Sequence, residues 1–174
     1  MTERVIHDAT PAQAAQLAEF GARTFFESFA ADNSPEDMRR HLESAWGPEK
    51  QQAEIADPDI DTLILADHEG RWLGFAQLRA KRVSDGVPGE GSIELWRFYV
   101  DKPFHGQGVA AELMAAAKQR ARRRGATSMW LGVWERNERA KTFYAKHGFH
   151  KVGSQVFVVG SDPQTDHVLL CPLA

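Results

Sequence analysis

The segment from His105 to Ala110 contains the residue types that can bind a phosphate group. It reads HGQGVA and links a strand-like run to a helical pattern. Glycines at positions 106 and 108 remove side chains that would hold a ligand away, and they permit backbone angles that other residues resist. Backbone amides at the start of a helix carry partial positive charge, so the segment predicts a pyrophosphate site.

Other phosphate-binding loops fit this segment less well. A Walker loop requires Gly-Lys-Ser or Gly-Lys-Thr, which is absent here, so a nucleoside triphosphatase is disfavoured. A dinucleotide fold expects a third glycine and an acidic residue about 20 positions later, where this chain has Thr127 and Ser128. On the loop alone, a phosphate site and a turn whose glycines serve only packing remain equally open.

The residues that flank the loop repeat the pattern of a known family. They are, in order along the chain, Phe98-Tyr99-Val100, Asn137, Ala140, Phe143-Tyr144 and Gly148-Phe149. Together with the two glycines, this order resembles the GCN5-related N-acetyltransferases (GNAT family), whose loop begins with Arg or Gln. His105 departs from that pattern. The resemblance covers nearly the whole chain and implies transfer of acetyl from acetyl-CoA to a primary amine.

Three longer segments, 24–29, 131–137 and 160–166, look like the PaiA-type spermidine/spermine N-acetyltransferases of bacteria. They favour a polyamine as the small-molecule acceptor. Other GNAT acceptors remain alternatives: a protein N-terminus, a lysine or an antibiotic amine. An alternative of another class is an acyl-CoA-binding sensor without catalytic activity.

The resemblance also assigns the residues that bind acetyl-CoA. The pyrophosphate is expected on the loop, at the amides of Gly106, Gln107, Gly108, Val109 and Ala110, with His105 at the start of the loop. The pantetheine arm is expected along Phe98, Tyr99 and Val100 and at the side chain of Asn137. The amide of Val100 also faces the developing oxyanion in this interpretation. No metal is expected, because the histidines lack metal-ligand spacing.

Acetyl transfer to an amine requires a base and an acid, because an alkylamine with a pKa near about 10.4 is protonated at neutral pH. We expect Tyr144 to protonate the departing thiolate, against the alternative of a core tyrosine. Glu94 is a candidate base, directly or through water, since period two places it on one face with Trp96 and Phe98. It could equally be an ion-paired carboxylate, and Glu27 is a second candidate base.

A polyamine acceptor would need carboxylates for its remaining ammonium groups. Glu27 and Asp32 are candidates, with Glu36 and Glu43 nearby, because the N-terminal helices roof the acceptor cleft in this family. The alternative is that these are ordinary solvated charges on helix surfaces.

The element pattern that must position these residues is an alternation of helices and strands. Helices are expected from Thr10-Pro11 to Phe29, from Ser34-Pro35 to Gly47-Pro48, before Asp57-Pro58, over 110–125 and over 137–148. Strands are expected over 5–7, 62–67, 71–80, 92–100, 129–134, 155–159 and 167–171. By resemblance this is an α/β GNAT fold whose mixed, mostly antiparallel sheet splays near Val100, in a single domain over 1–174.

The composition is that of a soluble globular protein, with 174 residues, a net charge of −3 and no long apolar run. We therefore expect no nucleic-acid or membrane partner and a cytoplasmic location. Cys171 is the single cysteine and is expected to fill core. A homodimer is common among proteins that resemble this chain.

Overall fold

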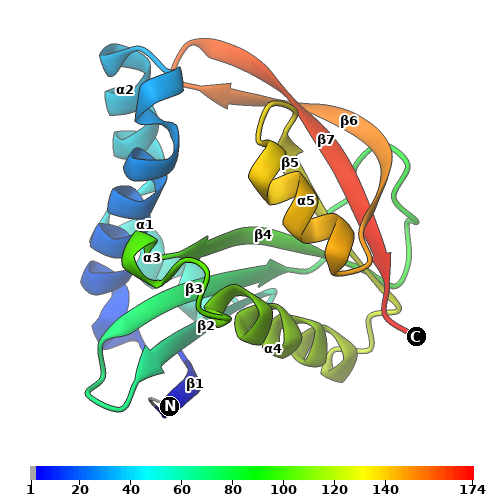
Figure 1. Ribbon diagram of the computed structural model, residues 1–174, viewed down its shortest axis with the longest axis horizontal. Helices are drawn as coiled ribbons and strands as arrows, with labels where there is room; N and C mark the ends of the chain where they lie inside the picture. The colour runs from blue at the N-terminus through cyan, green and yellow to red at the C-terminus, as the bar shows by residue number, and fades with distance from the viewer. Residues whose placement is uncertain (1–2) are drawn as a thin grey trace.

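A seven-stranded sheet joins the first and last elements of the chain in the computed structural model, which describes residues 3–174 (Figure 1). Its order is β1-β2-β3-β4-β5-β7-β6, and every neighbouring pair is antiparallel except β4 and β5. The expected mixed, mostly antiparallel sheet is confirmed. The strands are β1 (Arg4–Asp8), β2 (Ile60–Asp67), β3 (Trp72–Arg79), β4 (Ser92–Val100), β5 (Ser128–Trp134), β6 (His150–Val159) and β7 (Asp162–Pro172).

The helices begin where the sequence carries start signals. Ser34 accepts a hydrogen bond from the Asp37 amide (3.1 Å), and proline occupies the first turn of both α2 and α3. The α-helices are α1 (Ala14–Phe29), α2 (Pro35–Ala45), α3 (Pro48–Ala56), α4 (Val109–Arg123) and α5 (Glu138–Lys146), with 3-10 turns at Pro11–Gln13, Ala30–Asp32 and Lys102–Phe104. No helix within residues 3–174 combines the length and the apolar character needed to cross a bilayer.

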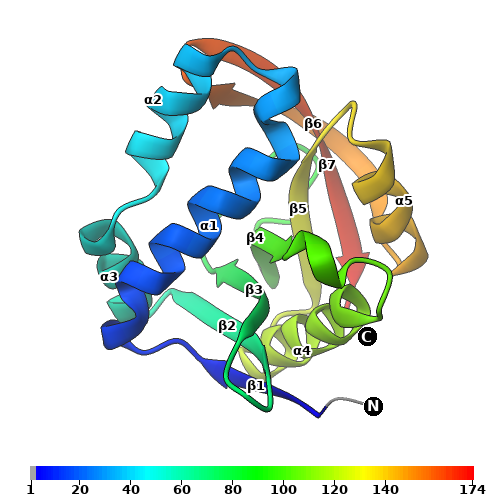
Figure 2. The same ribbon diagram turned by 60° about the vertical axis from the view of Figure 1, so that its left-hand side comes forward.

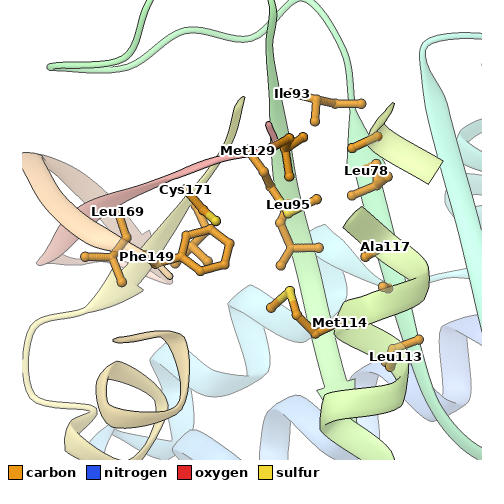
Figure 3. Close-up of a cluster of buried hydrophobic side chains, with 14 of the residues drawn as sticks. Leu78, Ile93, Leu95, Leu113, Met114, Ala117, Met129, Phe149, Leu169 and Cys171 are labelled. Carbon is orange, nitrogen blue, oxygen red and sulfur yellow. The ribbon is translucent and has the colours of Figure 1, made fainter. Parts of the chain in front are cut away.

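Each face of the sheet packs against its own set of helices. Helix α1 crosses one face of the sheet (Figure 2). Helix α4 and residues of α5 pack in a second, separate core. Leu17 and Phe20 of α1 pack with Trp72 and Phe75 of β3 in one core. In the other core, Leu113, Met114 and Ala117 of α4 lie beside Leu78 and Leu95 of the sheet, and Cys171 is buried there with Met129 and Phe149 (Figure 3).

The two halves of the sheet separate between β4 and β5. Their parallel pairing covers only Ser92–Glu94 on β4 and Ser128–Trp130 on β5. Within the described residues 3–174, residues 95–100 of β4 therefore have β3 as their only strand neighbour. The Asp101 amide donates to the Leu73 carbonyl of that neighbour (2.8 Å), and amide directions alternate along a strand, so the amides of Phe98 and Val100 point toward the opening. The expected splay near Val100 is confirmed.

A β-bulge in β4 changes which side chains share a face. Gln77 pairs with Arg97 while the next residue of β3, Leu78, pairs with Leu95, so Trp96 has no partner. The expectation that Glu94, Trp96 and Phe98 lie on one face is therefore wrong. Phe98 packs with the α4 core, whereas Glu94 pairs with Arg79 on the neighbouring strand.

The two tail strands are longer than expected. They pair from His150 with Leu170 to Val159 with Asp162, and a two-residue turn containing Gly160 joins them. The first half of β6 was not expected from the sequence, because it contains polar residues and Gly153. It forms a strand because β7 provides backbone hydrogen-bond partners along its length. The tip of this hairpin is tied to α2, since the amide and hydroxyl of Ser161 donate to Asp37 (2.8 and 2.7 Å).

Candidate active site

A cavity of about 790 Å³ lies where the two halves of the sheet separate. Most of the residues expected to bind or act on substrates line it. They are Glu27, Asp32, Phe98, Tyr99, Val100, His105, Gly106, Gly108, Ala110, Asn137 and Tyr144. Among the residues expected to bind acetyl-CoA or act in catalysis, three do not line it: Gln107, Val109 and Glu94.

One end of the cavity is the start of α4, where backbone amides lack partners. Gly106 and Gly108 have φ angles of +76° and +80°, and a Cβ at either position would meet no protein atom within 4 Å. The first intrahelical hydrogen bond runs from the Glu112 amide to the Gly108 carbonyl, and no side chain caps the helix. The amides of residues 106–111 are therefore free to bind an anion, and the helix dipole favours negative charge at this end of α4.

The side chains of Gln107 and Val109, which do not line the cavity, stabilise the loop through contacts with the rest of the protein. The side-chain amide of Gln107 donates to the Pro103 carbonyl (2.9 Å), and the Gln107 carbonyl accepts from Arg4 of β1 (3.0 Å). Val109 is buried in the α4 core at 1% exposure. Both residues could still contribute backbone amides, but their side chains hold the loop in place.

His105, the position that departs from the family pattern, ties the loop to the end of β4. Its Nε2 donates to the Val100 carbonyl at 2.7 Å, which places the ring proton on that nitrogen because a carbonyl oxygen only accepts. The Val100 amide belongs to the preceding peptide unit and points toward the same opening, so this contact does not occupy it. His105 therefore fixes the strand end against which an extended ligand would lie.

Asn137 and Tyr144 reach the cavity from α5. The Asn137 side-chain oxygen accepts from the Ala140 amide (3.2 Å), so it caps the helix and keeps its own NH₂ group available. Tyr144 packs edge-on against Phe98 and Phe149, with ring centroids 6.3 and 5.6 Å apart. Burial raises the pKa of Tyr144, and its hydroxyl makes no hydrogen bond to any group of residues 3–174. The phenol is therefore protonated at neutral pH and free to donate.

Glu94 lies outside the residues that line the cavity. It is 5% exposed and forms a two-oxygen ion pair with Arg79 (2.6 and 3.0 Å). Burial raises the pKa of Glu94, although the Arg79 guanidinium acts in the opposite direction. The structure therefore places this carboxylate in a buried ion pair next to the β4 bulge, where Arg79 and Arg97 stack on the Trp96 ring at 3.9 Å.

A carboxylate that the sequence analysis missed does line the cavity. Asp166 of β7 lies opposite Trp134 of β5 and is 6% exposed. Burial raises the pKa of Asp166 to about 6, and the side-chain amide of Gln155 offsets only part of that shift. The available signal was the alternation of β7, which places Asp166 on the same face as the buried Val168.

The wall formed by α1, the segment 30–33, β6 and β7 differs in charge from the rest of the cavity; we call it the α1–β7 side. Its lining residues are Thr24, Phe25, Glu27, Ser28, Phe29, Asp32, Asn33, Phe157, Val159, Gln164 and Asp166, without a lysine, arginine or histidine. Glu27 has an ion pair with Arg23 at 3.4 Å. Glu36 and Glu43 pair with Arg39 on the α2 surface and do not line the cavity.

Basic residues line the cavity outside the α1–β7 side, on the loop before α4, which we call the loop side, and in and beside α5. They are Lys102, His105, Arg136, Arg139 and His147. A cavity with free helix amides and Lys and Arg side chains outside its carboxylate-bearing α1–β7 side can accommodate an anionic cofactor beside a cationic substrate. Within residues 3–174, no three His, Cys, Asp or Glu side chains come together in a group that could hold a metal ion.

Comparison with known proteins gives one consistent family. The sequence model of the acetyltransferase (GNAT) family matches residues 23–149. An uncharacterised N-acetyltransferase from Lactobacillus delbrueckii subsp. lactis is 36% identical over 156 residues, which are 88% of this chain and 90% of that protein. An uncharacterised N-acetyltransferase from Mycobacterium tuberculosis is 32% identical over 156 residues, 89% of this chain and 94% of that protein.

A solved structure shares the fold over almost the whole chain. The crystal structure of a PaiA N-acetyltransferase from Thermoplasma acidophilum in complex with coenzyme A superimposes with a TM-score of 0.80. The match covers 98% of this chain and 99% of the other, at 20% identity. At that identity the likeness shows the fold.

Proposed function

This chain belongs to the GNAT family of acetyltransferases and is an N-acetyltransferase, and we propose that it acetylates a primary amine of a polyamine, with acetyl-CoA as the donor. One observation carries the choice of acceptor: the α1–β7 side of the cavity presents Glu27, Asp32 and Asp166 among aromatic rings and no basic side chain. A cationic alkylamine fits such a wall because carboxylates bind ammonium groups and ring faces attract cations.

We propose that acetyl-CoA enters from the loop side. Its pyrophosphate would bind the free amides at Gly106, Gly108 and Ala110, where the helix dipole and open glycine faces favour an anion. Its pantetheine arm would run along β4, where the amides of Phe98 and Val100 point into the opening, and bond the NH₂ group of Asn137. This arrangement brings the thioester toward Tyr144.

Tyr144 would act as the general acid. The deprotonated amine attacks the thioester carbonyl carbon, the C–S bond breaks, and the phenol gives its proton to the departing thiolate. The phenolate recovers a proton from the nitrogen that has formed the amide. A cysteine intermediate has no support in the site, because Cys171 is buried in the α4 core and is not among the residues that line the cavity.

The aromatic lining supports a long, flexible amine over a compact polar one. Phe29 and Trp134 meet edge-on with centroids 6.4 Å apart, and Phe25 and Phe157 complete this wall. Such rings can pack the methylene segments of a polyamine while carboxylates bind its charged ends. The segments 24–29, 131–137 and 160–166, which resemble PaiA-type enzymes, all contribute residues to the cavity.

The test is a thiol-release assay with acetyl-CoA and a panel of amines. The panel contains spermidine, spermine, free lysine, a peptide with a free N-terminus and an aminoglycoside. We expect the highest kcat/KM with spermidine or spermine. Turnover of another amine, with none of either polyamine, would remove the polyamine from the proposal and leave the acetyltransferase assignment in place.

A further inference from the structure

Asp166 differs from the other two carboxylates on the α1–β7 side in its burial. It is 6% exposed, whereas the Glu27 side chain is 37% exposed and Asp32 is an exposed residue. It makes no ion pair with any Lys or Arg of residues 3–174, while Glu27 pairs with Arg23. A buried carboxylate without a cation is costly, and it is commonly found where a cationic ligand or a proton transfer supplies the missing partner.

The surroundings of Asp166 are built to hold this carboxylate at the cavity. Residue 132 is glycine, and a Cβ there would lie 3.0 Å from Oδ2 of Asp166 and 2.3 Å from Nε2 of Gln155. The side-chain oxygen of Gln155 accepts from the Ser84 hydroxyl (2.8 Å), which leaves the Gln155 NH₂ group to face the carboxylate. Gly132 therefore leaves the space that the Asp166 and Gln155 side chains occupy.

Asp166 and the proposed acid, Tyr144, share Tyr99 as a neighbour. Burial chiefly raises the pKa of Tyr99 to about 12, and the nearby charge of Asp166 contributes to this shift; Tyr99 makes a smaller contribution than burial to the raised pKa of Tyr144. All three side chains line the same cavity. The carboxylate and the phenol thus reach one cavity, which Tyr99 lines from the splayed end of β4.

We propose that Asp166 is the catalytic base, which binds the ammonium group of the acceptor and takes its proton. This inference rests on the proposed N-acetylation of a primary amine. One N–H bond of the ammonium breaks, the proton joins the Asp166 carboxylate, and the nitrogen lone pair then forms the C–N bond with the thioester carbon. Asp166 later releases its proton to solvent, so one proton is produced for each acetylated amine.

The groups around Asp166 are consistent with this step. Tyr99 faces it from β4, Gln155 from β6, and Glu27 and Asp32 line the same side from α1 and the turn that follows. Burial raises the pKa of the Asp166 carboxyl and lowers that of a bound amine, which reduces the difference across which the proton moves. At neutral pH the carboxylate is still mostly ionised and able to accept.

The test compares Asp166→Asn with the wild-type enzyme over pH 5 to 9. The acceptor is spermidine, or the amine with the highest kcat/KM in the panel if spermidine is not turned over. We expect the variant to lose about 100-fold or more in kcat/KM at pH 7, as is typical when a general base is removed. We also expect the wild-type fall in rate toward low pH to disappear. Affinity for coenzyme A, measured by calorimetry, should stay within about twofold.

The matched control is Asp162→Asn, which makes the same change at an exposed position of the same strand, outside the cavity. This control should keep the wild-type rate and pH profile. Asp166→Ala gives an independent measurement, because formate can enter the space that the side chain leaves and should restore part of the lost rate.

The outcomes separate this inference from the proposed function. An Asp166→Asn enzyme with kcat/KM within about threefold of wild type, or with an unchanged pH profile, overturns the role of Asp166 and leaves the acetyltransferase proposal standing. Loss of coenzyme A affinity in both Asp166 variants, without rescue by formate, also overturns it, because it would show a structural role. A wild-type enzyme that acetylates no amine of the panel overturns both.

Discussion

Burial raises the pKa of both the partly buried Tyr144 and the buried Asp166, yet the two groups differ in charge at neutral pH. A raised pKa keeps the Tyr144 phenol protonated and therefore able to donate. A pKa of about 6 leaves the Asp166 carboxyl mostly ionised and therefore able to accept. In the proposed mechanism, one cavity thus holds an acid and a base in the protonation states that amine acetylation requires.

The acid can be tested by removing a single oxygen. Tyr144→Phe keeps the ring that packs against Phe98 and Phe149, and the hydroxyl has no hydrogen-bond partner within residues 3–174. We expect kcat to fall by about 100-fold, with an unchanged melting temperature and an unchanged affinity for coenzyme A. Steady-state kinetics, thermal unfolding and calorimetry measure these three quantities. A variant that keeps wild-type kcat would show that the thiolate leaves without a proton from this phenol.

Burial of Asp166 should also appear in the stability of the folded protein. Its pKa rises from 3.8 to about 6 on folding, so its contribution is most favourable below about pH 4 and is lost as the pH rises through 6. Because asparagine does not titrate, Asp166→Asn removes this loss of folding stability at higher pH. We expect the free energy of unfolding of the variant, relative to wild type, to increase by about 2 kcal/mol between pH 4.5 and pH 8.

Urea unfolding of both proteins at the two pH values measures this difference, and other titrating groups cancel because they are common to both. A difference that is the same at pH 4.5 and pH 8 would contradict the raised pKa. It would not bear on whether Asp166 touches the substrate.

At the scale of elements, the start of α4 depends on glycine for two separate reasons. Gly108 has a φ of +80° and also presents an open face toward the cavity. Gly108→Ala should cost about 1 kcal/mol in stability from the left-handed backbone, and its methyl group should also obstruct the pyrophosphate. We expect the dissociation constant for coenzyme A to rise at least about tenfold.

Gly70 provides the matched comparison for this substitution. It lies in the turn between β2 and β3, has a φ of +82°, and likewise has no protein atom within 4 Å of the point that a Cβ would occupy. Gly70→Ala should therefore lose a similar stability and bind coenzyme A as wild type does. Equal affinities of the two variants for coenzyme A would argue against a phosphate site at the start of α4.

The sequence predicted the elements with local signals and missed the features that depend on pairing between distant strands. Ser34-Pro35, Asn137 and the glycines around α4 act within a few residues, so the helices and the loop were predictable. The bulge at Trp96 arises from the register of β4 on β3, and it turns Glu94 away from the face it was expected to share with Phe98. Asp166 was missed because only the pairing of β7 with β5 brings it to the cavity.

At the scale of the whole molecule, the cavity is formed by segments from almost the entire length of the chain. Its lining residues run from Thr24 of α1 to Asp166 of β7, and one sheet connects them. The pairing of Asp37 with Ser161 joins the N-terminal helices to the last hairpin at the same side. We propose that residues 1–174 form a single domain, so that binding of coenzyme A stabilises the whole chain.

Thermal unfolding tests this proposal, because tryptophans report from both halves of the sheet, which separate between β4 and β5. Trp46 and Trp72 lie in the α1 core, and Trp130 lies on β5. We expect far-UV circular dichroism and tryptophan fluorescence to give one coincident transition. Coenzyme A at about 100 times its dissociation constant should add about 2.7 kcal/mol, which raises the melting temperature by about 5–10 °C for a chain of this size. Two transitions, only one of which shifts with coenzyme A, would divide the chain into separate units, because a ligand stabilises only the unit whose folding forms its site.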